Sequence, residues 1–131
     1  MHEPFIIQLD LHINTYMKYS EITSNLALEK FLEICRQELE LESLPEIHFV
    51  DQDSMSGTAF GEYDGAVRVV SNGRHTLDVF RTLAHELVHW KQSQTGQTLD
   101  GSDGSDTENE ANAVAGIIMR RVGRQFPHLF S

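Results

Sequence analysis

The sequence predicts an α+β fold in which a small sheet packs against three helices. Two hydrophobic patterns support this prediction: helix-length segments whose apolar residues recur every three or four positions, and short segments in which apolar and polar residues alternate. Their order is strand, helix, several strands, helix, helix, which is typical of an α+β architecture. With 131 residues, the chain is expected to form a single domain over residues 1–131.

A strand and a first helix are expected at the start of the chain. Apolar residues alternate with mostly polar ones over residues 5–13, which predicts a half-buried strand. A helix is expected over roughly 24–41, beginning at Ser24 or Asn25 and broken by Leu44-Pro45. Its apolar stripe consists of Leu28, Phe31, Leu32, Cys35 and Leu39.

Three short strands are expected next, over residues 46–50, 58–63 and 66–70. Asp64-Gly65 stands between the last two and is a strong signal for the tight turn of a β-hairpin. Phe60 and Tyr63 on this hairpin could line a groove, although alternation would bury Phe60 equally well. The predicted sheet is therefore small, and mixed or antiparallel.

A second helix is expected over roughly 77–93, with Thr76 as its N-cap and Asp78 in its first turn. Gly96 lies where this helix should end. The segment 96–106 is rich in Gly, Ser, Asp and Thr, which predicts a mobile surface loop. The buried stripe of the helix is formed by Phe80, Leu83, Ala84, Leu87 and Val88.

A third helix is expected over roughly 107–123, capped by Asp106 or Thr107. Gly123 and Pro127 are expected to end it. Its inner face is formed by Ala111, Val114, Ala115, Ile118, Met119 and Val122.

The composition limits the class of protein. Ten Lys and Arg stand against 20 Asp and Glu, a formal charge of −10 at pH 7, so a surface that binds nucleic acid is not expected. No apolar run approaches the roughly 20 residues that cross a bilayer, and the first residues carry no secretory signal. We therefore expect a cytoplasmic protein without a membrane partner. Cys35 is the single cysteine, which excludes an intramolecular disulfide and a cysteine-based structural zinc site.

His85-Glu86-Leu87-Val88-His89 is an H-E-x-x-H motif inside the second predicted helix. Residues four apart lie one turn apart on the same helix face, so both imidazoles can bind one metal ion. Glu86 stands beside them, where its carboxylate can reach a metal-bound water without binding the metal. Zinc lowers the pKa of such a water toward about 7, and Glu86 can accept its proton during attack on a carbonyl. The alternative is a pair of structural histidines at helical spacing.

A catalytic zinc needs a third protein ligand and an open fourth position. Glu108 and Glu110, both at the start of the third predicted helix, are the candidates downstream of His89. Glu108 shares a helix face with Ala111 and Asn112, which border the buried stripe, and this favours Glu108. Either glutamate could instead serve only as negative charge at a helix N-terminus.

These motifs resemble those of the gluzincin metallopeptidases, in which a glutamate follows H-E-x-x-H on another helix, within E-x-x-[AS]-[DN]. Glu108-Asn109-Glu110-Ala111-Asn112 matches that pattern, and 18 residues separate it from His89, as in the aminopeptidase branch. The resemblance covers residues 58–120 or so and implies a minimal zincin-like domain. In the family, the small residue of the motif lets the two helices approach closely, and the Asp or Asn supports the metal ligands. The ligands implied for one zinc ion per chain are His85, His89 and Glu108.

The segments around His85 and Glu108, with the Pro-His-Leu-Phe end, are similar to small single-domain metallopeptidase-like proteins of tailed phages. That resemblance implies the host cytosol as the compartment. The gluzincin resemblance implies that an edge strand of the predicted hairpin docks an extended peptide. Gluzincins usually carry a Tyr or His that stabilises the oxyanion, and no motif marks one here. The candidates are Tyr63, His75, Arg120 and His128.

The expected function is hydrolysis of peptide bonds in a protein or peptide substrate by a zinc-bound water that Glu86 activates. The alternative is a catalytically weak or inactive zincin-type protein whose groove captures a protein partner. A DNA-associated protease is a third class, which the acidic charge and the single cysteine disfavour.

Overall fold

The computed structural model describes residues 25–55, 57–102 and 104–127. Over this part of the chain, three α-helices and a three-stranded sheet form an α+β fold, as predicted. The strand predicted over 5–13 lies outside the described residues. In chain order the elements are α3 (Asn25–Leu39), β1 (Ile47–Val50), the 3-10 turn η1 (Gln52–Ser54), β2 (Gly61–Tyr63), β3 (Val67–Val70), α4 (Thr76–Gln94) and α5 (Asp106–Gln125).

The sheet is mixed, with the strand order β1-β3-β2. β1 pairs in parallel with β3, whereas β2 pairs antiparallel to β3 with Tyr63 opposite Val67. The hairpin predicted at Asp64-Gly65 is thus confirmed. Gly65 has a φ of 105°, a left-handed conformation that favours glycine. Because β2 has only β3 as a neighbour, it is an edge strand of this sheet.

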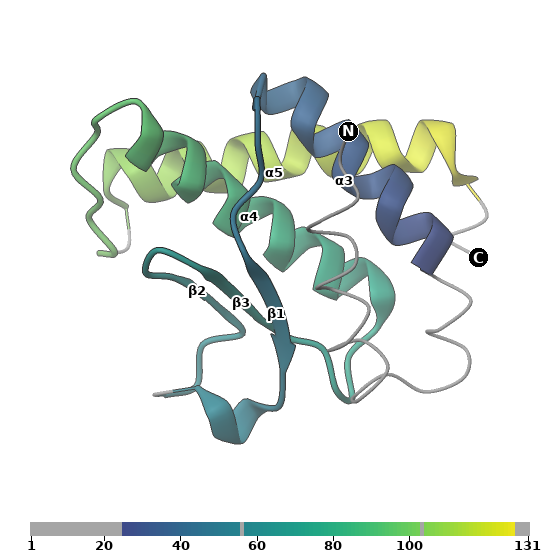
Figure 1. Cartoon of the computed structure of the whole chain (residues 1–131), viewed down its shortest axis with the longest axis horizontal. Coiled ribbons are helices and arrows are strands. Elements are labelled where there is room, and N and C mark those ends of the chain that lie inside the picture. Colours follow the sequence, from purple (N-terminus) through teal and green to yellow (C-terminus); the bar gives the residue numbers. More distant parts are fainter. Residues whose placement is uncertain (1–24, 56, 103, 128–131) are drawn as a thin grey trace.

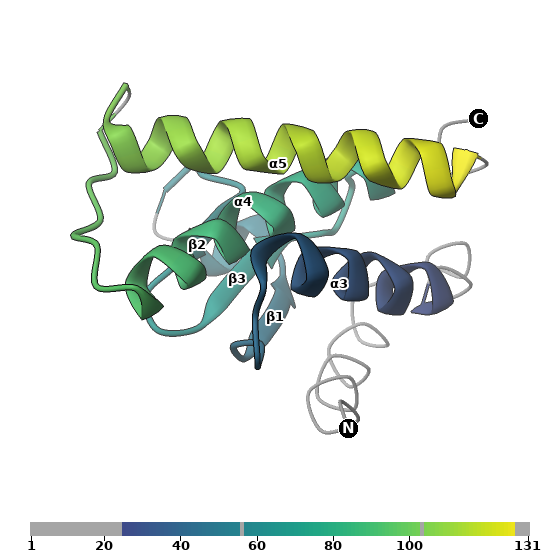
Figure 2. The same ribbon diagram turned by 90° about the horizontal axis from the view of Figure 1, so that it is seen from above.

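α4 is the central element of the fold (Figure 1). It packs against β2 and β3, and also against α3 and α5. α5 runs back across α4 in the opposite direction (Figure 2). The core draws on both sheet and helices, and Phe31 of α3 stacks on Phe80 of α4 with ring centroids 4.4 Å apart. The helix stripes predicted from the sequence are buried, except that Val114 is only partly buried.

Both predicted N-caps were wrong by one or two residues. α4 is capped by His75 rather than by Thr76, because the Nδ1 atom of His75 accepts a hydrogen bond from the backbone N–H of Leu77. α5 is capped by Ser105, whose hydroxyl accepts from the backbone N–H of Glu108 at 3.2 Å, rather than by Asp106 or Thr107. In each case several polar residues precede the helix, and the last one outside helical geometry becomes the cap.

Three predicted element boundaries differ from the structure by two residues or more. The strand predicted over 58–63 begins only at Gly61, where pairing with β3 begins. α3 ends at Leu39 because Glu40 adopts a φ of 54°, well before Leu44-Pro45. Gly123 does not end α5, which continues to Gln125. A single glycine within a helix costs only about 1 kcal/mol, which tertiary packing can offset.

Among the described residues, no helix is long and apolar enough to cross a membrane.

Candidate metal centre

The two histidines of H-E-x-x-H lie on one side of α4, one turn apart. Their ring centroids are 4.8 Å apart and the ring planes meet at 82°. Leu87, between them in sequence, is fully buried in the core and fixes how far α4 can rotate. The packing of α4 therefore determines the direction in which both imidazoles point.

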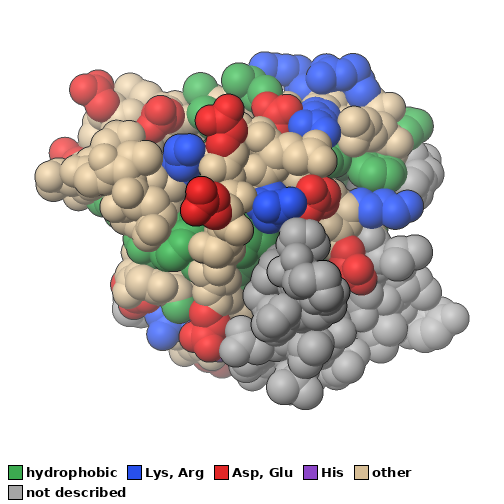
Figure 3. Space-filling view, turned by 45° about the horizontal axis from the view of Figure 1, so that its top comes forward, with side chains coloured by type: hydrophobic (Ala, Val, Ile, Leu, Met, Phe, Trp, Pro, Cys, Tyr) green, Lys and Arg blue, Asp and Glu red, His purple; other side chains and the backbone are tan. Residues whose placement is uncertain are grey.

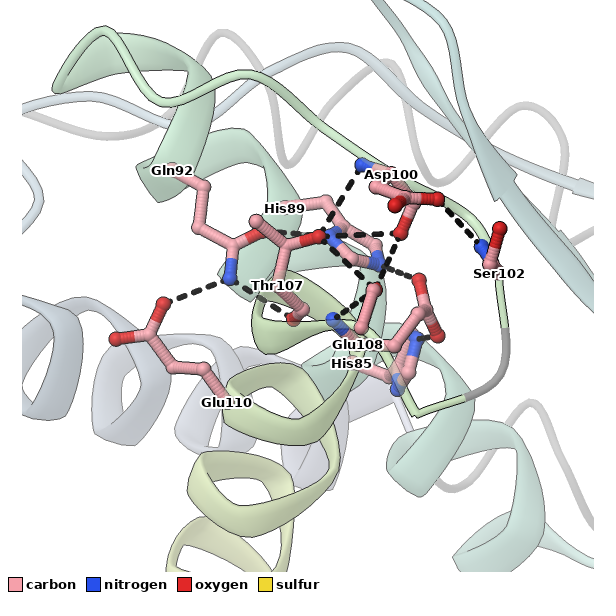
Figure 4. A network of polar contacts seen from close by, with 9 residues as sticks. His85, His89, Gln92, Asp100, Ser102, Thr107, Glu108 and Glu110 are labelled. Atoms are coloured by element: carbon pink, nitrogen blue, oxygen red, sulfur yellow. Dashed lines mark hydrogen bonds and ion pairs between the residues drawn. The ribbon is translucent and has the colours of Figure 1, made fainter.

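α5 supplies a carboxylate that meets both imidazoles (Figure 4). The Nε2 atom of His85 lies 3.2 Å from Oε1 of Glu108, and the Nε2 atom of His89 lies 2.7 Å from Oε2. The Ser105 cap orients this first turn of α5, since its hydroxyl accepts from the backbone N–H of Glu108 itself. One ligand atom from each of the three residues lies within 4.8 Å of the others.

Of the two glutamates that the sequence left open, only Glu108 joins the histidines. Glu110 is exposed and accepts a hydrogen bond of 2.7 Å from Nε2 of Gln92. Two residues along a helix correspond to a rotation of about 200°, so the two side chains leave α5 on different sides. The helix-face argument for Glu108 thus agrees with the structure.

His89 has a hydrogen-bond partner besides Glu108. The Nδ1 atom of His89 lies 2.7 Å from Oε1 of Gln92, and Nε2 of Gln92 donates to the backbone carbonyl of Thr107 at 3.0 Å. Metal-binding histidines commonly donate their second ring N–H to such an acceptor, which fixes the tautomer and the ring orientation.

Gln92 was missed by the sequence reasoning. It is only 1% exposed, which is unusual for glutamine, and it lies three residues after His89 on the same face of α4. That spacing was a usable signal, because residues three apart on a helix are neighbours. Gln92 thus connects His89 to the first turn of α5.

Glu86 is buried beside the histidines and is covered by the edge strand. Its side chain is 7% exposed, and burial together with the charges of Glu108 and Glu62 raises its pKa to about 8. Gly61 of β2 lies directly over it, since a Cβ atom at Gly61 would stand 3.0 Å from Oε2 of Glu86 and 2.5 Å from Cγ2 of Thr82. Only glycine permits this approach. A single glycine inside a predicted strand often marks a close approach of another segment, so Gly61 was the feature from which this contact could have been predicted.

A pocket of about 400 Å³ opens at this group of residues. Strand β2 forms one wall and the loop before α5 forms another. That loop is tied to α5 at Asp100, whose backbone carbonyl accepts from the hydroxyls of Thr107 at 3.1 Å and Ser105 at 2.7 Å. Sequence reasoning did not place this loop at the site. The pocket is lined by Ala59, Gly61, Glu62, Tyr63, His85, Glu86, His89, Leu99, Asp100, Gly101 and Glu108.

Of the four oxyanion candidates, Tyr63 lines this pocket, and its hydroxyl shares a hydrogen bond of 2.9 Å with the hydroxyl of Ser93. His75 instead caps α4, and Arg120 lines a different pocket. His128 lies outside the described residues.

The donor set suits a divalent transition metal, and zinc in particular. Zinc takes imidazole nitrogen and carboxylate oxygen at about 2.0–2.2 Å, and donors placed tetrahedrally at that distance stand about 3.4 Å apart. The Nε2–Oε separations of 3.2 and 2.7 Å are shorter than this value and are those of direct contact, while the three ligand atoms all lie within 4.8 Å of one another. Burial lowers the pKa of His85 and so favours the neutral imidazole that binds metal, although the charge of Glu108 raises it in part. His85, His89 and Glu108 could therefore hold a metal ion.

Comparison of the chain with protein-family models, with curated proteins and with solved structures gives no significant match.

Proposed function

We propose that this protein is a zinc-dependent peptidase of the gluzincin type. The observation that supports the proposal best is the meeting of Glu108 with the Nε2 atoms of both histidines, at 3.2 and 2.7 Å, beside the buried Glu86. Three ligands from two helices leave one tetrahedral position for water or substrate, as in catalytic rather than structural zinc sites.

Glu86 has the properties of a general base. Zinc in this site would polarise the substrate carbonyl and lower the pKa of bound water toward about 7. Glu86 lines the pocket without belonging to the ligand group, so its carboxylate is free to accept the proton of the attacking water. Burial raises the pKa of Glu86 to about 8 in the metal-free protein, and a bound cation nearby would lower it again, so that Glu86 could accept the proton of the water and then pass it to the leaving amine.

The substrate is proposed to be an extended peptide bound beside β2. This strand is at the edge of the sheet and its residues Gly61, Glu62 and Tyr63 form a wall of the pocket. An extended peptide can pair with such an edge through backbone hydrogen bonds. Tyr63, the oxyanion candidate that lines the pocket, would have to exchange its hydrogen bond with Ser93 for one to the oxyanion.

The substitution Glu86→Gln tests the proposal. The variant should retain one zinc ion per chain, measured by plasma mass spectrometry, and should lose cleavage of casein and of an unstructured peptide. The ligands remain in this variant, while the base is lost. Glu42→Gln, the same change at an exposed position outside the pocket, is the control and should cleave like the wild type.

Two outcomes would contradict the proposal. A wild-type protein that binds no stoichiometric metal would remove its basis. Retained cleavage by Glu86→Gln would remove Glu86 from its role. Zinc binding and peptide binding without turnover in the wild type would favour the alternative of a zincin-type binding protein.

A further inference from the structure

A second pocket lies along the same α4–α5 seam as the candidate metal centre. It has a volume of about 400 Å³. On α4, its lining includes Arg81, one turn before His85. On α5, it includes Gly116, about two turns after Glu108. The pocket is lined by Arg81, Gly116, Met119, Arg120, Gly123 and Pro127.

Two arginines that face this pocket have no partner within the described part of the chain. Neither Arg81 nor Arg120 makes a hydrogen bond or an ion pair there, and both are exposed. By contrast, Arg36, Arg68 and Arg121 each pair with a glutamate. Unpaired guanidinium groups are notable in a chain with a formal charge of −10.

Basic side chains gather on the half of the molecule where α5 ends (Figure 3). The three glutamates nearest the metal centre, Glu62, Glu86 and Glu108, line the other pocket. The seam between α4 and α5 therefore runs from an acidic pocket to a basic one. A cation suits the first and an anionic group suits the second.

The pocket lining carries no side chain at Gly116. A Cβ atom built on Gly116 would meet only the Nη1 atom of Arg120, 4.0 Å away. Met119, which is 4% exposed, contributes an apolar wall to the pocket. A site that joins two guanidinium groups to an apolar wall fits an acidic side chain, whose methylene groups pack on the wall while its carboxylate meets the guanidinium groups.

We propose that this pocket binds an acidic side chain of the substrate. The inference rests on the proposed function, because it identifies the ligand as part of the peptide held at the metal centre. With a rise of 1.5 Å per residue, Arg81 lies about 6 Å along α4 from His85, and Gly116 lies about 12 Å along α5 from Glu108. An extended peptide advances about 3.3 Å per residue, so the acidic residue stands about two to four positions from the cleaved bond.

The test uses fluorogenic twelve-residue peptides of one background sequence, in which a single glutamate is moved through every position. Each peptide has a twin, a control peptide that carries glutamine in place of that glutamate. The wild type should cleave the glutamate peptide about tenfold better than its twin at one position, two to four residues from the bond. The double substitution Arg81→Gln/Arg120→Gln should reduce that ratio to within about twofold, with cleavage of the glutamine twin unchanged. Arg124→Gln, which removes one exposed arginine that does not line the pocket, should leave the ratio intact.

Binding provides a readout that does not depend on turnover. Fluorescence anisotropy with Glu86→Gln protein should show the same preference for the glutamate peptide, and its loss in the arginine variants. Equal cleavage and equal binding of each twin pair would overturn the inference while leaving the proposed peptidase activity standing. A glutamate preference in binding, lost in the arginine variants but without cleavage by the wild type, would support this site and contradict the proposed activity. No binding and no cleavage of any peptide would overturn both.

Discussion

The two faces of α4 differ in the contacts that hold their side chains in place. On one face, Leu83, Ala84 and Leu87 are fully buried among apolar residues. On the other, His85, His89 and their polar partners depend on side chains that α5 brings in. The apolar face determines where the helix lies, and the polar face uses that position to bring both imidazoles to Glu108, a group that could hold a metal ion. Stability and chemistry should therefore respond to different substitutions in the same helix.

The largest expected effect is on the polar face. His89→Ala should lower peptidase activity by at least about 10³-fold, because the metal supplies several kcal/mol of transition-state stabilisation. Its far-UV circular dichroism should match that of the wild type, since the apolar face is intact. Activity above one hundredth of the wild-type value, with zinc present, would show that His89 is not a ligand.

Glu86 lies beside the histidines but is as buried as a core residue. In chelator-treated protein, its carboxylate should therefore lower the free energy of unfolding. Its pKa rises from 4.5 to about 8 on folding, so the folded state retains a proton that the unfolded chain releases. The free energy of unfolding should therefore fall as pH rises from about 4.5 to about 8. The free energy of unfolding of metal-free Glu86→Gln should exceed that of the wild type by up to about 4 kcal/mol at pH 8, and the two values should be equal at pH 4. Urea unfolding at both pH values measures this difference, and a constant difference would contradict the account.

On the apolar face, Leu87→Ala should lower the free energy of unfolding by about 3 kcal/mol, because it opens a cavity in the core. The folded fraction should still bind one zinc ion per chain. Ile117→Ala is the control, since this side chain of α5 is 44% exposed and should change stability by less than about 1 kcal/mol. Loss of zinc from folded Leu87→Ala would mean that the two faces are not separable.

The smallest effect concerns the residue that links the two helices. Gln92→Leu removes the partner of His89 and should weaken zinc binding by about 10- to 100-fold, as found for such supporting groups. Gln94→Leu makes the same change at an exposed position two residues later and should bind zinc like the wild type. Competition with a chromophoric chelator measures both affinities. Equal affinities of the two variants would remove Gln92 from the site.

Features that follow short-range periodicity could be predicted from the sequence. The stripes of α3, α4 and α5 and the four-residue spacing of His85 and His89 are local patterns, and helix geometry converts them into faces. The preference for Glu108 over Glu110 also came from a helix face. The hairpin followed from the left-handed turn that Gly65 permits.

The remaining features depend on contacts between distant segments. The burial of Glu86 under Gly61 requires β2 to pass over α4, and the pocket wall at Asp100 requires a particular path of the loop before α5. Neither path leaves a periodic trace in the sequence. The cap errors have a different cause, because adjacent polar residues such as His75 and Thr76 compete for one position.

Zinc affinity in a pair of glutamate variants tests the central claim most directly. The claim is that Glu108 of α5 completes a site with His85 and His89. Isothermal titration with zinc should show one site per chain in the wild type, binding at least about 100-fold weaker in Glu108→Ala, and near wild-type affinity in Glu110→Ala. Wild-type affinity in Glu108→Ala, or a comparable loss in Glu110→Ala alone, would contradict it.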